Sequence, residues 1–409
     1  MNVPRTPLRP LDQALSELLV FATPLSQTEQ VATFDTDGRV LAQDLVSALH
    51  VPAHDNSSMD GYAVRCADIA AAGTVLPVSQ RIAAGAPGSP LAAGSAARIF
   101  TGAPIPAGAN AIVMQEDCEV TAAGAVRIQT VPIPDQWIRR AGEDVANGAV
   151  VLSKGERLTP AALGLAASIG MNCVTVVRRP RVALFSTGDE LVMPGEVAPR
   201  DMKPGTIYNS NRFFLRALLL RLGCEVSDLG IVPDRLDATE QALQSAAQGH
   251  DVILTSGGVS VGEEDHVKAA VQALGSIDLW QIAIKPGKPF AYGQVGAAHF
   301  IGLPGNPVSS FVTFLLLVRP FLLKLAGARQ FAMKSVAANA HFVWPRADKR
   351  REFLRVRRNP QGGLELFANQ SSAVLTSAVW ADGLVDNPPG QIIEYGDLVR
   401  YVPFAELLA

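Results

Sequence analysis

The stretch from residue 181 to residue 325 constrains the fold most, because apolar strand-like segments alternate there with amphipathic helical ones. This alternation is typical of a parallel sheet covered by helices, in which ligands bind beyond the carboxyl ends of the strands. A glycine-rich hairpin is expected before the last helix. The expected strands are 182–186, 224–229, 252–255 and 279–284, and the expected helices are 211–222, 238–247, 266–274 and 307–325.

Shorter elements flank this unit on both sides. Leucines at helical spacing predict a helix over residues 11–25, and Thr159 followed by Pro160 predicts a capped helix through residue 169. Between these helices, short β-branched stretches separated by glycine and proline indicate a small β domain. After about residue 331, alternating segments indicate a closing β domain. The strands expected in these two parts are 96–101, 111–115, 126–131, 353–356, 364–367, 392–395 and 398–402.

Composition excludes several classes of protein. With 48% hydrophobic and 18% charged residues, the chain is neither intrinsically disordered nor a coiled coil. A net charge of −3 gives no global attraction to nucleic acid or to an anionic membrane. The apolar segment 311–318 is shorter than the roughly 18 residues of a membrane span, and the opening residues lack a signal-peptide pattern. The four cysteines have neither metal-ligand nor disulfide-scaffold spacing, so we expect a soluble, cytoplasmic protein.

Two polar loops follow expected strands of the sheet. They read STGDEL over residues 186–191 and SGGVSVGEED over residues 256–265. Glycines let backbone N–H groups approach a phosphate closely, and the next helix presents its positive N-terminal end. Helix capping by Ser and Asp explains either loop alone equally well. Neither loop has the Gly-Lys-Ser/Thr ending of a P-loop, and the chain has no G-x-G-x-x-G fingerprint.

Other motifs are ambiguous when each is taken alone. DNSSMDGYA (55–63), FTGAPIP (100–106) and RRAGED (139–144) fit plain turns and exposed ion pairs as well as oxyanion or metal sites. Lys285 and Lys288 place cations in a Pro-Gly turn after a strand. Asn306 and Pro307 have the residue types of a helix N-cap and first turn. The basic run 346–358 is expected to be a solvated strand face.

The order of the motifs is more specific than any one of them. DNSSMDGYA, TGAPIP, RRAGED, FSTGDEL, SGGVSVGEED, IKPGKP and GLPGNPVS succeed one another along the chain. This order resembles the MoeA family of molybdopterin molybdenumtransferases, which includes the E domain of gephyrin. The resemblance implies a multidomain α/β protein and a homodimer with its active site between subunits. The implied units are a helical and β linker unit (1–50 and 146–178), a small β domain (51–145), an α/β domain similar to molybdopterin-adenylylating proteins (179–328) and a C-terminal β barrel (329–409).

The resemblance also implies a reaction and its residues. The substrates would be adenylylated molybdopterin and molybdate, AMP would be released, and Glu190 and Asp265 would hold Mg²⁺. Carboxylates suit Mg²⁺, while lysine and arginine suit oxyanions. Contacts with other proteins of molybdenum cofactor synthesis are implied as well. The catalytic positions carried over are Asp60, Thr101, Asp144, Glu190, Asp234 and Asp265, and the binding positions are Ser256, Gly257, Gly258, Ser260, Gly262, Lys285, Lys288, Arg350 and Ser372.

Two other functions stay open at this point. A molybdopterin-adenylylating enzyme would share the α/β fold, but its related loop usually reads Ser-Gly-Gly-Thr-Gly, whereas this chain has Val259 at the fourth position. Valine is β-branched, so it tolerates positive φ poorly and fills space that a triphosphate would need. A non-catalytic scaffold of the same fold is the second alternative, and the retained acidic positions weigh against it.

Overall fold

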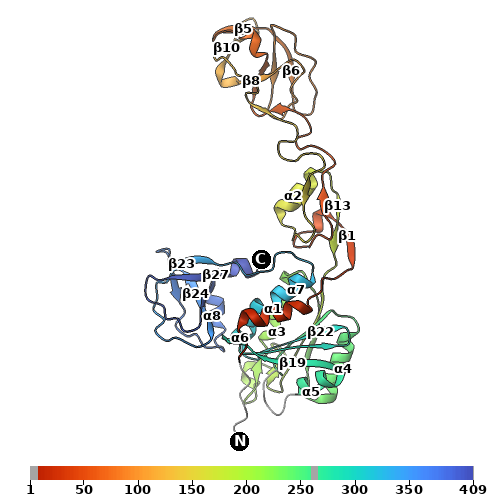
Figure 1. Ribbon diagram of the computed structural model, residues 1–409, viewed down its shortest axis with the longest axis vertical. Helices are drawn as coiled ribbons and strands as arrows, with labels where there is room; N and C mark the ends of the chain where they lie inside the picture. The colour runs from red at the N-terminus through yellow and green to blue at the C-terminus, as the bar shows by residue number, and fades with distance from the viewer. Residues whose placement is uncertain (1–7, 259–265, 409) are drawn as a thin grey trace.

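The computed structural model describes residues 8–258 and 266–408, which form an elongated molecule (Figure 1). A small β domain occupies one end, and a narrow linker unit connects it to an α/β domain with a C-terminal β domain beside it. The chain enters the small β domain at Val51 and leaves it at Val145, and these two residues pair with each other. We call residues 51–145 the tip domain.

The α/β domain is built on a six-stranded sheet. Four neighbouring strands pair in parallel, as expected, and two antiparallel pairs follow at one edge, where the expected hairpin lies. The strands lie in the order β17 (Glu225–Val232), β14 (Arg181–Thr187), β18 (Val252–Ser256), β22 (Ala298–Leu303), β21 (Pro289–Val295) and β19 (Gly275–Gln281).

The strand expected at 279–284 was placed wrongly. β19 ends at Gln281, and residues Ile284–Lys285 form a separate short strand, β20, which pairs with the C-terminal domain. Ile282 and Ile284 are fully buried in the core, so the apolar pattern continues past the end of the sheet. Ile282 and Ile284 are therefore buried although they lie beyond Gln281, where the hydrogen bonds of this strand to the sheet end.

Helices cover both faces of this sheet. The helices expected at 211–222, 238–247 and 266–274 are confirmed as α3 (Asn211–Arg221), α4 (Leu236–Ala247) and α5 (His266–Leu274). Buried residues of α4 and α5 pack on one face. Those of α3 and the last long helix pack on the other, together with the N-terminal helix. The sheet is thus enclosed between two apolar layers, as its nearly continuous apolar strands require.

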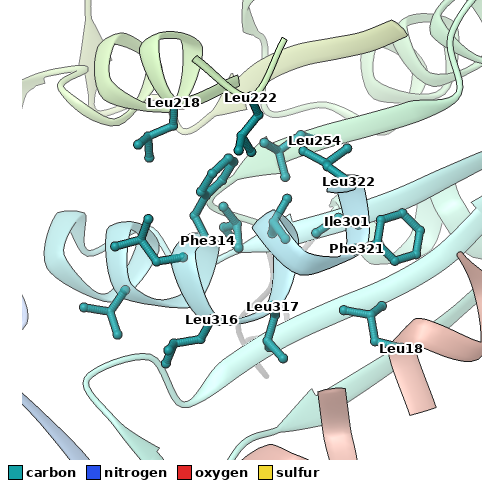
Figure 2. Packing of buried hydrophobic residues seen from close by; sticks show 14 of the residues in the cluster. Leu18, Leu218, Leu222, Leu254, Ile301, Phe314, Leu316, Leu317, Phe321 and Leu322 are labelled. Carbon is teal, nitrogen blue, oxygen red and sulfur yellow. The ribbon is translucent and has the colours of Figure 1, made fainter. Parts of the chain in front are cut away.

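The last long helix runs from Pro307 to Leu325 through the larger of these layers (Figure 2). It consists of α6 (Pro307–Thr313), a wide π turn η5 (Phe314–Val318) and α7 (Arg319–Leu325). Pro320 lacks an N–H and its ring crowds the preceding turn, which accounts for the widening. Within the described residues, this helix alone has the length and mean hydropathy, 1.8, to cross a membrane, and 89% of that window is buried inside the protein. The apolar segment expected from the sequence, 311–318, is only the middle of this helix.

The N-terminal helix α1 (Leu11–Phe21) packs on the same layer through Leu11, Ala14 and Leu18. It ends four residues before the predicted end at residue 25, because Pro24 disfavours helical geometry in the residue before it. The Lys324 ammonium donates to the Leu19 carbonyl at 2.6 Å, which satisfies one carbonyl of the final turn.

Two short antiparallel ribbons form the linker unit. β1 (Thr28–Ala32) pairs with β13 (Cys173–Val177), and β2 (Leu45–Val46) pairs with β12 (Val150–Leu152). α2 (Pro160–Ser168) packs beside them, and the Thr159 hydroxyl accepts from the Ala162 N–H at 3.3 Å, so the predicted cap is confirmed. Each ribbon joins a segment before the tip domain to one after it.

The tip domain contains two small sheets and a two-stranded ribbon. Separate clusters of buried residues lie within it. One sheet has the order β6 (Val78–Ile82), β7 (Ala96–Ile99), β4 (Gly61–Val64) and β8 (Ala111–Met114). The other has the order β5 (Thr74–Leu76), β10 (Val126–Ile128) and β9 (Cys118–Val120), and β3 (Asn56–Ser57) pairs with β11 (Ile138–Arg139).

The C-terminal domain is a curved sheet. Its order is β20, β24 (Arg351–Arg358), β26 (Gly383–Asn387), β27 (Leu398–Pro403) and β23 (Val336–Asn339), with β25 (Leu364–Leu366) on β24 and two short helices, α8 (Thr376–Trp380) and α9 (Phe404–Leu408). The strand expected at 392–395 is wrong. Ile393 makes only an isolated bridge to Trp344, because turns containing Gly390 and Gly396 flank it.

The basic run 346–358 is solvated only in part, because Arg346, Lys349, Arg357 and Arg358 are exposed, as expected, whereas Arg355 is buried. Arg355 is 1% exposed, and its guanidinium donates to the Phe353 and Ser371 carbonyls and to the Ser377 hydroxyl. Burial lowers the pKa of Arg355 to about 10. Arg355 therefore holds part of the domain together from inside.

An ion pair joins the linker unit to the sheet, and we expect its loss to destabilise the protein. Both guanidinium nitrogens of Arg178, which follows β13, donate to Asp251, which precedes β18, at 2.7 Å. Replacing Asp251 with Asn leaves a mostly buried cation unpaired, so the free energy of unfolding should fall by about 3 kcal/mol. The matched control is Glu225→Gln, which breaks an exposed pair with Arg181 and should cost at most about 1 kcal/mol. Chemical denaturation measures both.

The same pair predicts a dependence on pH. Burial raises the pKa of the Asp251 carboxyl, but hydrogen bonds from Arg178 and the Arg181 N–H outweigh it, so the pKa lies below its ordinary value. The stabilisation is therefore complete above the unfolded-state pKa of about 3.9 and is lost as pH falls through the folded-state pKa. Stability of the Asp251→Asn variant should decline less over that range. An equal decline in both proteins would contradict the assignment.

Candidate active site

A cavity of about 630 Å³ lies at the carboxyl ends of β14, β18 and β22. This is the edge of the sheet where the sequence predicted a ligand site. Its walls come from six separate stretches of the sequence. The lining residues are Thr187, Glu190, Leu191, Ile207, Tyr208, Asn209, Ser210, Asn211, Ser256, Gly257, Gly258, Pro289, Pro304, Gly305, Asn306, Pro307, Ser309 and Ala373.

The loop after β14 brings a carboxylate to the cavity. Gly188 has φ of 140°, a backbone conformation that favours glycine, and a Cβ there would lie 2.5 Å from the carboxylate of Glu190, whose exposed side chain can move away. The Glu190 carbonyl accepts from the Ile207 N–H at 2.7 Å, which holds the loop next to the ribbon of β15 (Leu191–Val192) and β16 (Ile207–Tyr208). The Glu190 side chain is exposed and enters no ion pair within residues 8–258 and 266–408. It is available to a ligand.

The loop after β18 provides a backbone wall. Gly257 and Gly258 have φ of 94° and 64°, and a Cβ would meet the Thr187 carbonyl at 2.9 Å or Val267 at 2.4 Å. Both positions therefore require glycine, as expected of a phosphate cradle. Ser256 is 3% exposed beside them. The remaining predicted residues of this loop, Ser260, Gly262 and Asp265, lie outside the described residues, as does Val259.

The third wall is the start of α6. Pro307 occupies its first position, as predicted, but Asn306 makes no side-chain cap hydrogen bond, which corrects the expected capping role. The Val308 N–H donates to the Ser372 carbonyl at 2.9 Å, and Ala373 lines the cavity. The C-terminal domain thus reaches the cavity through the backbone of this loop.

Sequence reasoning missed the wall formed by residues 208–211. Asn211 donates from its side chain to the Gly305 carbonyl at 2.7 Å, and the Asn209 side-chain oxygen accepts from the Arg212 N–H at 3.2 Å. Asn209 is 2% exposed, and its amide nitrogen has no hydrogen-bond partner in the described structure. The available signal was an Asn-Ser-Asn cluster before a predicted helix, which is typical of an N-terminal cap.

Two of the predicted cations, Lys285 and Arg350, lie close together at the C-terminal domain, and both form ion pairs with carboxylates. The Lys285 ammonium lies 2.9 Å from Glu352 and 3.4 Å from Asp348, and Arg350 lies 2.9 Å from Asp348. Hydrogen bonds from Arg350 hold the pKa of the Asp348 carboxyl well below its usual range. Lys288 is exposed on the same turn. Any anion bound by Lys285 or Arg350 must compete with these two carboxylates.

The structure separates other predicted residues from this cavity. Asp60 and Thr101 meet in the tip domain, where the Thr101 N–H and hydroxyl both donate to the Asp60 carboxylate at 2.8 Å. These two hydrogen bonds lower the pKa of Asp60. Asp144 is exposed where the tip domain joins the linker unit. Figure 1 shows that the tip domain and the α/β domain lie at opposite ends of the elongated molecule.

Asp234 is at the correct edge of the sheet but outside the cavity. It follows β17, whose carboxyl end lies beside that of β14, and it is partly exposed.

In the tip domain, β3 and β11 bring the DNSSMDGYA and RRAGED motifs together, and Arg140 pairs with Asp55 there. The ambiguous arginine-carboxylate motif therefore contains a structural ion pair.

The described residues contain no group of three or more His, Cys, Asp or Glu side chains that could enclose a metal ion. Glu190 is a single carboxylate on the cavity wall. Mg²⁺ needs only one or two protein carboxylates when substrate phosphates and water complete its octahedral shell. The donor set that is described fits a metal bound jointly with a phosphate and does not fit one caged by protein alone.

Comparisons with known proteins cover nearly the whole chain. Three family models match: the MoeA N-terminal region (domain I and II) over residues 9–170, a probable molybdopterin binding domain over residues 183–324, and the MoeA C-terminal region (domain IV) over residues 337–404. A molybdopterin molybdenumtransferase of Haemophilus influenzae is 40% identical over 97% of this chain and 99% of its own. One from Synechococcus elongatus is 39% identical over 89% of this chain and 91% of its own.

A solved structure agrees with these sequence matches. The crystal structure of a molybdopterin biosynthesis moeA protein from Pyrococcus horikoshii is 28% identical and covers 97% of this chain and 100% of its own, with a TM-score of 0.84. The similarity therefore extends across the tip domain, the linker unit, the α/β domain and the C-terminal domain.

We predict that the cavity wall tolerates no side chain at residue 257. In Gly257→Ala the new Cβ meets the Thr187 carbonyl, which is backbone and cannot rotate away, in addition to the strain of positive φ. Gly170 is a matched control, because its φ of 85° is similar and nothing lies within 4 Å of a Cβ there. Gly257→Ala should lower the free energy of unfolding by about 3 kcal/mol, and Gly170→Ala by only about 1 kcal/mol. Equal losses would show that the close approach is unimportant.

Proposed function

The chain belongs to the MoeA family, and on that premise we propose that it is a molybdopterin molybdenumtransferase, an enzyme that inserts molybdenum from molybdate into adenylylated molybdopterin and releases AMP. The observation that carries this proposal is the cavity at the carboxyl ends of β14, β18 and β22, where two glycines with positive φ face a free carboxylate. The four units are assigned as linker, tip, molybdopterin-binding and C-terminal barrel domains.

The phosphate of the substrate is assigned to the loop after β18. Ser256, Gly257 and Gly258 expose backbone at the cavity, and Ser260 and Gly262 follow them in the sequence. Backbone N–H groups in such turns bind anions without the desolvation of a buried side-chain charge. The N-terminus of α6 at Pro307 adds its positive end on the neighbouring wall. The site therefore suits a phosphate ester that is already formed.

Molybdate is assigned to the cations beside the C-terminal domain. Lys285, Lys288, Arg350 and Ser372 belong to segments that meet near the start of α6, and lysine and arginine bind oxyanions. Asp348 and Glu352 neutralise these cations in the absence of a ligand. An arriving dianion would exchange partners with them, so its affinity should be moderate and depend on salt.

The proposed metal is Mg²⁺, held by Glu190 and Asp265 together with phosphate oxygens of the substrate. A bound Mg²⁺ would neutralise charge on the phosphate and on the leaving AMP. Glu190 has no competing cation in the part of the chain that the structure describes. Its backbone is held by the Ile207 N–H at 2.7 Å, and its exposed carboxylate lies near Gly188. Asp234, at the same edge, is assigned to positioning solvent or metal ligands around it.

We also propose a homodimer that unites the separated residues. Asp60, Thr101 and Asp144 lie in or next to the tip domain, far from the cavity of their own chain (Figure 1). In a two-fold dimer the tip of one subunit can reach the cavity of the other. A cytoplasmic location and contacts with other proteins of molybdenum cofactor synthesis complete the proposal.

Two rival functions give different results in one assay. A molybdopterin-adenylylating enzyme would release pyrophosphate from ATP and molybdopterin, and a scaffold would release nothing. The proposed enzyme should instead release AMP from adenylylated molybdopterin in a molybdate-dependent manner. Pyrophosphate in the first reaction, with no molybdate-dependent AMP in the second, would show that another step of the pathway is catalysed.

We predict that Glu190→Gln slows AMP release about 100-fold, because the amide keeps the shape of the side chain but removes the charge that binds a cation. The control is Glu196→Gln, an exposed glutamate six positions further along the chain, between β15 and β16. It should retain full activity. Both variants should unfold at the temperature of the parent protein. Normal turnover by Glu190→Gln would show that Glu190 has no role in the reaction.

We predict that two inactive variants complement each other. Asp60→Ala removes a tip residue and Glu190→Ala a cavity residue, so a mixed dimer retains one intact composite site. Mixing after subunit exchange should restore up to about one quarter of the parent activity, by random pairing. Light scattering should give twice the 43.2 kDa of the chain. An active monomer, or exchange without recovery, would contradict a shared site.

A further inference from the structure

The tip domain carries a second hollow, of about 550 Å³, that the proposed function does not use. It lies over the strands β6, β7 and β4, and its wall is formed by charged and aromatic side chains. Those that matter here are Tyr62, Gln80, Arg81, Arg98 and Phe100.

Two arginines of this hollow are placed directly opposite each other. Arg81 on β6 and Arg98 on β7 are register partners, and Arg98 is in turn the partner of Tyr62 on β4. The two guanidinium groups lie 4.8 Å and 4.7 Å from the centre of the Phe100 ring. Like charges on paired strands repel each other, so this arrangement is unfavourable unless something compensates it.

Neither arginine forms an ion pair with a carboxylate of the described chain, although the charge of Arg98 contributes to the lowered pKa of the nearby Asp60. Arg98 donates to the Gly61 carbonyl at 3.1 Å and to the Gln115 side-chain oxygen at 2.7 Å, both of which are neutral. The side-chain nitrogen of Gln115 donates in turn to the Glu116 carboxylate, so this carboxylate is connected to Arg98 only through Gln115. Arg127 of the same domain, by contrast, pairs with Glu119 at 3.4 Å. The ring contacts hold both guanidinium groups at the hollow, where neither has an ion-pair partner among the described residues.

The hollow adjoins residues that the proposed function requires. Tyr62 is two positions after Asp60, and Phe100 immediately precedes Thr101, whose N–H and hydroxyl bind the Asp60 carboxylate. An anion held by the arginines would therefore lie beside this pair of residues. Arginine suits such an anion because its planar fork donates two parallel hydrogen bonds to one oxyanion.

We propose that Arg81 and Arg98 form a binding site for a tetrahedral oxyanion with two negative charges. The chemistry fits the phosphate monoester of a nucleotide and an inorganic oxyanion such as molybdate alike. The site itself follows from the tip domain, and only the choice between these two ligands rests on the proposed function.

The test measures hydrogen exchange of the full-length protein by mass spectrometry, in peptides that cover β6 and β7. The three probes are inorganic phosphate, AMP and molybdate, each titrated separately at constant ionic strength. At least one probe should slow exchange in these peptides with a saturable dependence on its concentration. In Arg81→Gln the dissociation constant should rise at least tenfold, because one of two charges is lost.

Two further variants make the test specific. Arg127→Gln removes an equal charge from the same domain but not from the hollow, and it should bind like the parent. Arg98→Lys keeps the charge but loses the fork, so it should bind more weakly than the parent. Protection by AMP but not by molybdate would identify the nucleotide phosphate as the source, and the reverse would identify the inorganic ion.

Three results would overturn the proposal: no protection by any probe, equal affinity in Arg81→Gln and the parent, or equal weakening in Arg127→Gln. Thermal unfolding verifies that each variant is folded, and Arg98→Lys replaces Arg81→Gln if the latter is not. Molybdate-dependent AMP release by the parent protein is assayed separately. A failure of the proposed function is therefore distinguishable from a failure of this site.

Discussion

One apolar cluster holds three of the four parts of this protein together, and the rest of the structure depends on it. The helix from Pro307 to Leu325 lies within this cluster, where its side chains pack near those of the sheet and of α1 (Figure 2). The same cluster contains Phe353 and Phe404 of the C-terminal domain, and the ring of Phe404 contacts that of Phe311 on the helix. Burial of apolar surface is not directional, but close packing allows few arrangements of the parts. The tip domain has its own smaller clusters instead. The position of the tip is therefore set by the linker ribbons rather than by a shared core.

The cluster also determines where chemistry can occur. The long helix begins at the cavity, so packing of its apolar turns fixes its N-terminal end against the carboxyl ends of the strands. Arg355 then fixes the neighbouring loop, because its buried guanidinium holds the Ser371 carbonyl and the Ser377 hydroxyl on either side of Ser372. The cavity thus receives polar backbone from two domains and one free carboxylate, Glu190. The apolar interior therefore holds in place the main-chain groups that make the cavity wall polar.

The sequence predicted local structure well wherever periodicity and burial agree. The strand β14 and the helices α3 and α4 follow such patterns, as does the Thr159 cap. The prediction failed where burial continued beyond the sheet, at Ile284, and where charged residues were buried, at Arg355, because periodicity records neither hydrogen-bond partners nor ion pairs. Glu190, Ser256, Gly257 and Gly258 were placed correctly at the cavity by the strand-end rule. Asn209 was missed because its role depends on a ribbon formed by residues distant in the sequence, and Asp265 lies outside the described residues.

The pairing of Val51 with Val145, where the chain enters and leaves the tip domain, has a consequence for the order of folding. Each linker ribbon joins a segment before the tip to one after it, so neither ribbon can form until the intervening chain has closed a long loop. Closing a loop costs entropy that grows with its length, and a folded tip domain shortens the effective loop to the distance between two adjacent residues. The tip domain thus acts as an internal template for assembly of the linker, and a tip that folds slowly would delay every later step of folding.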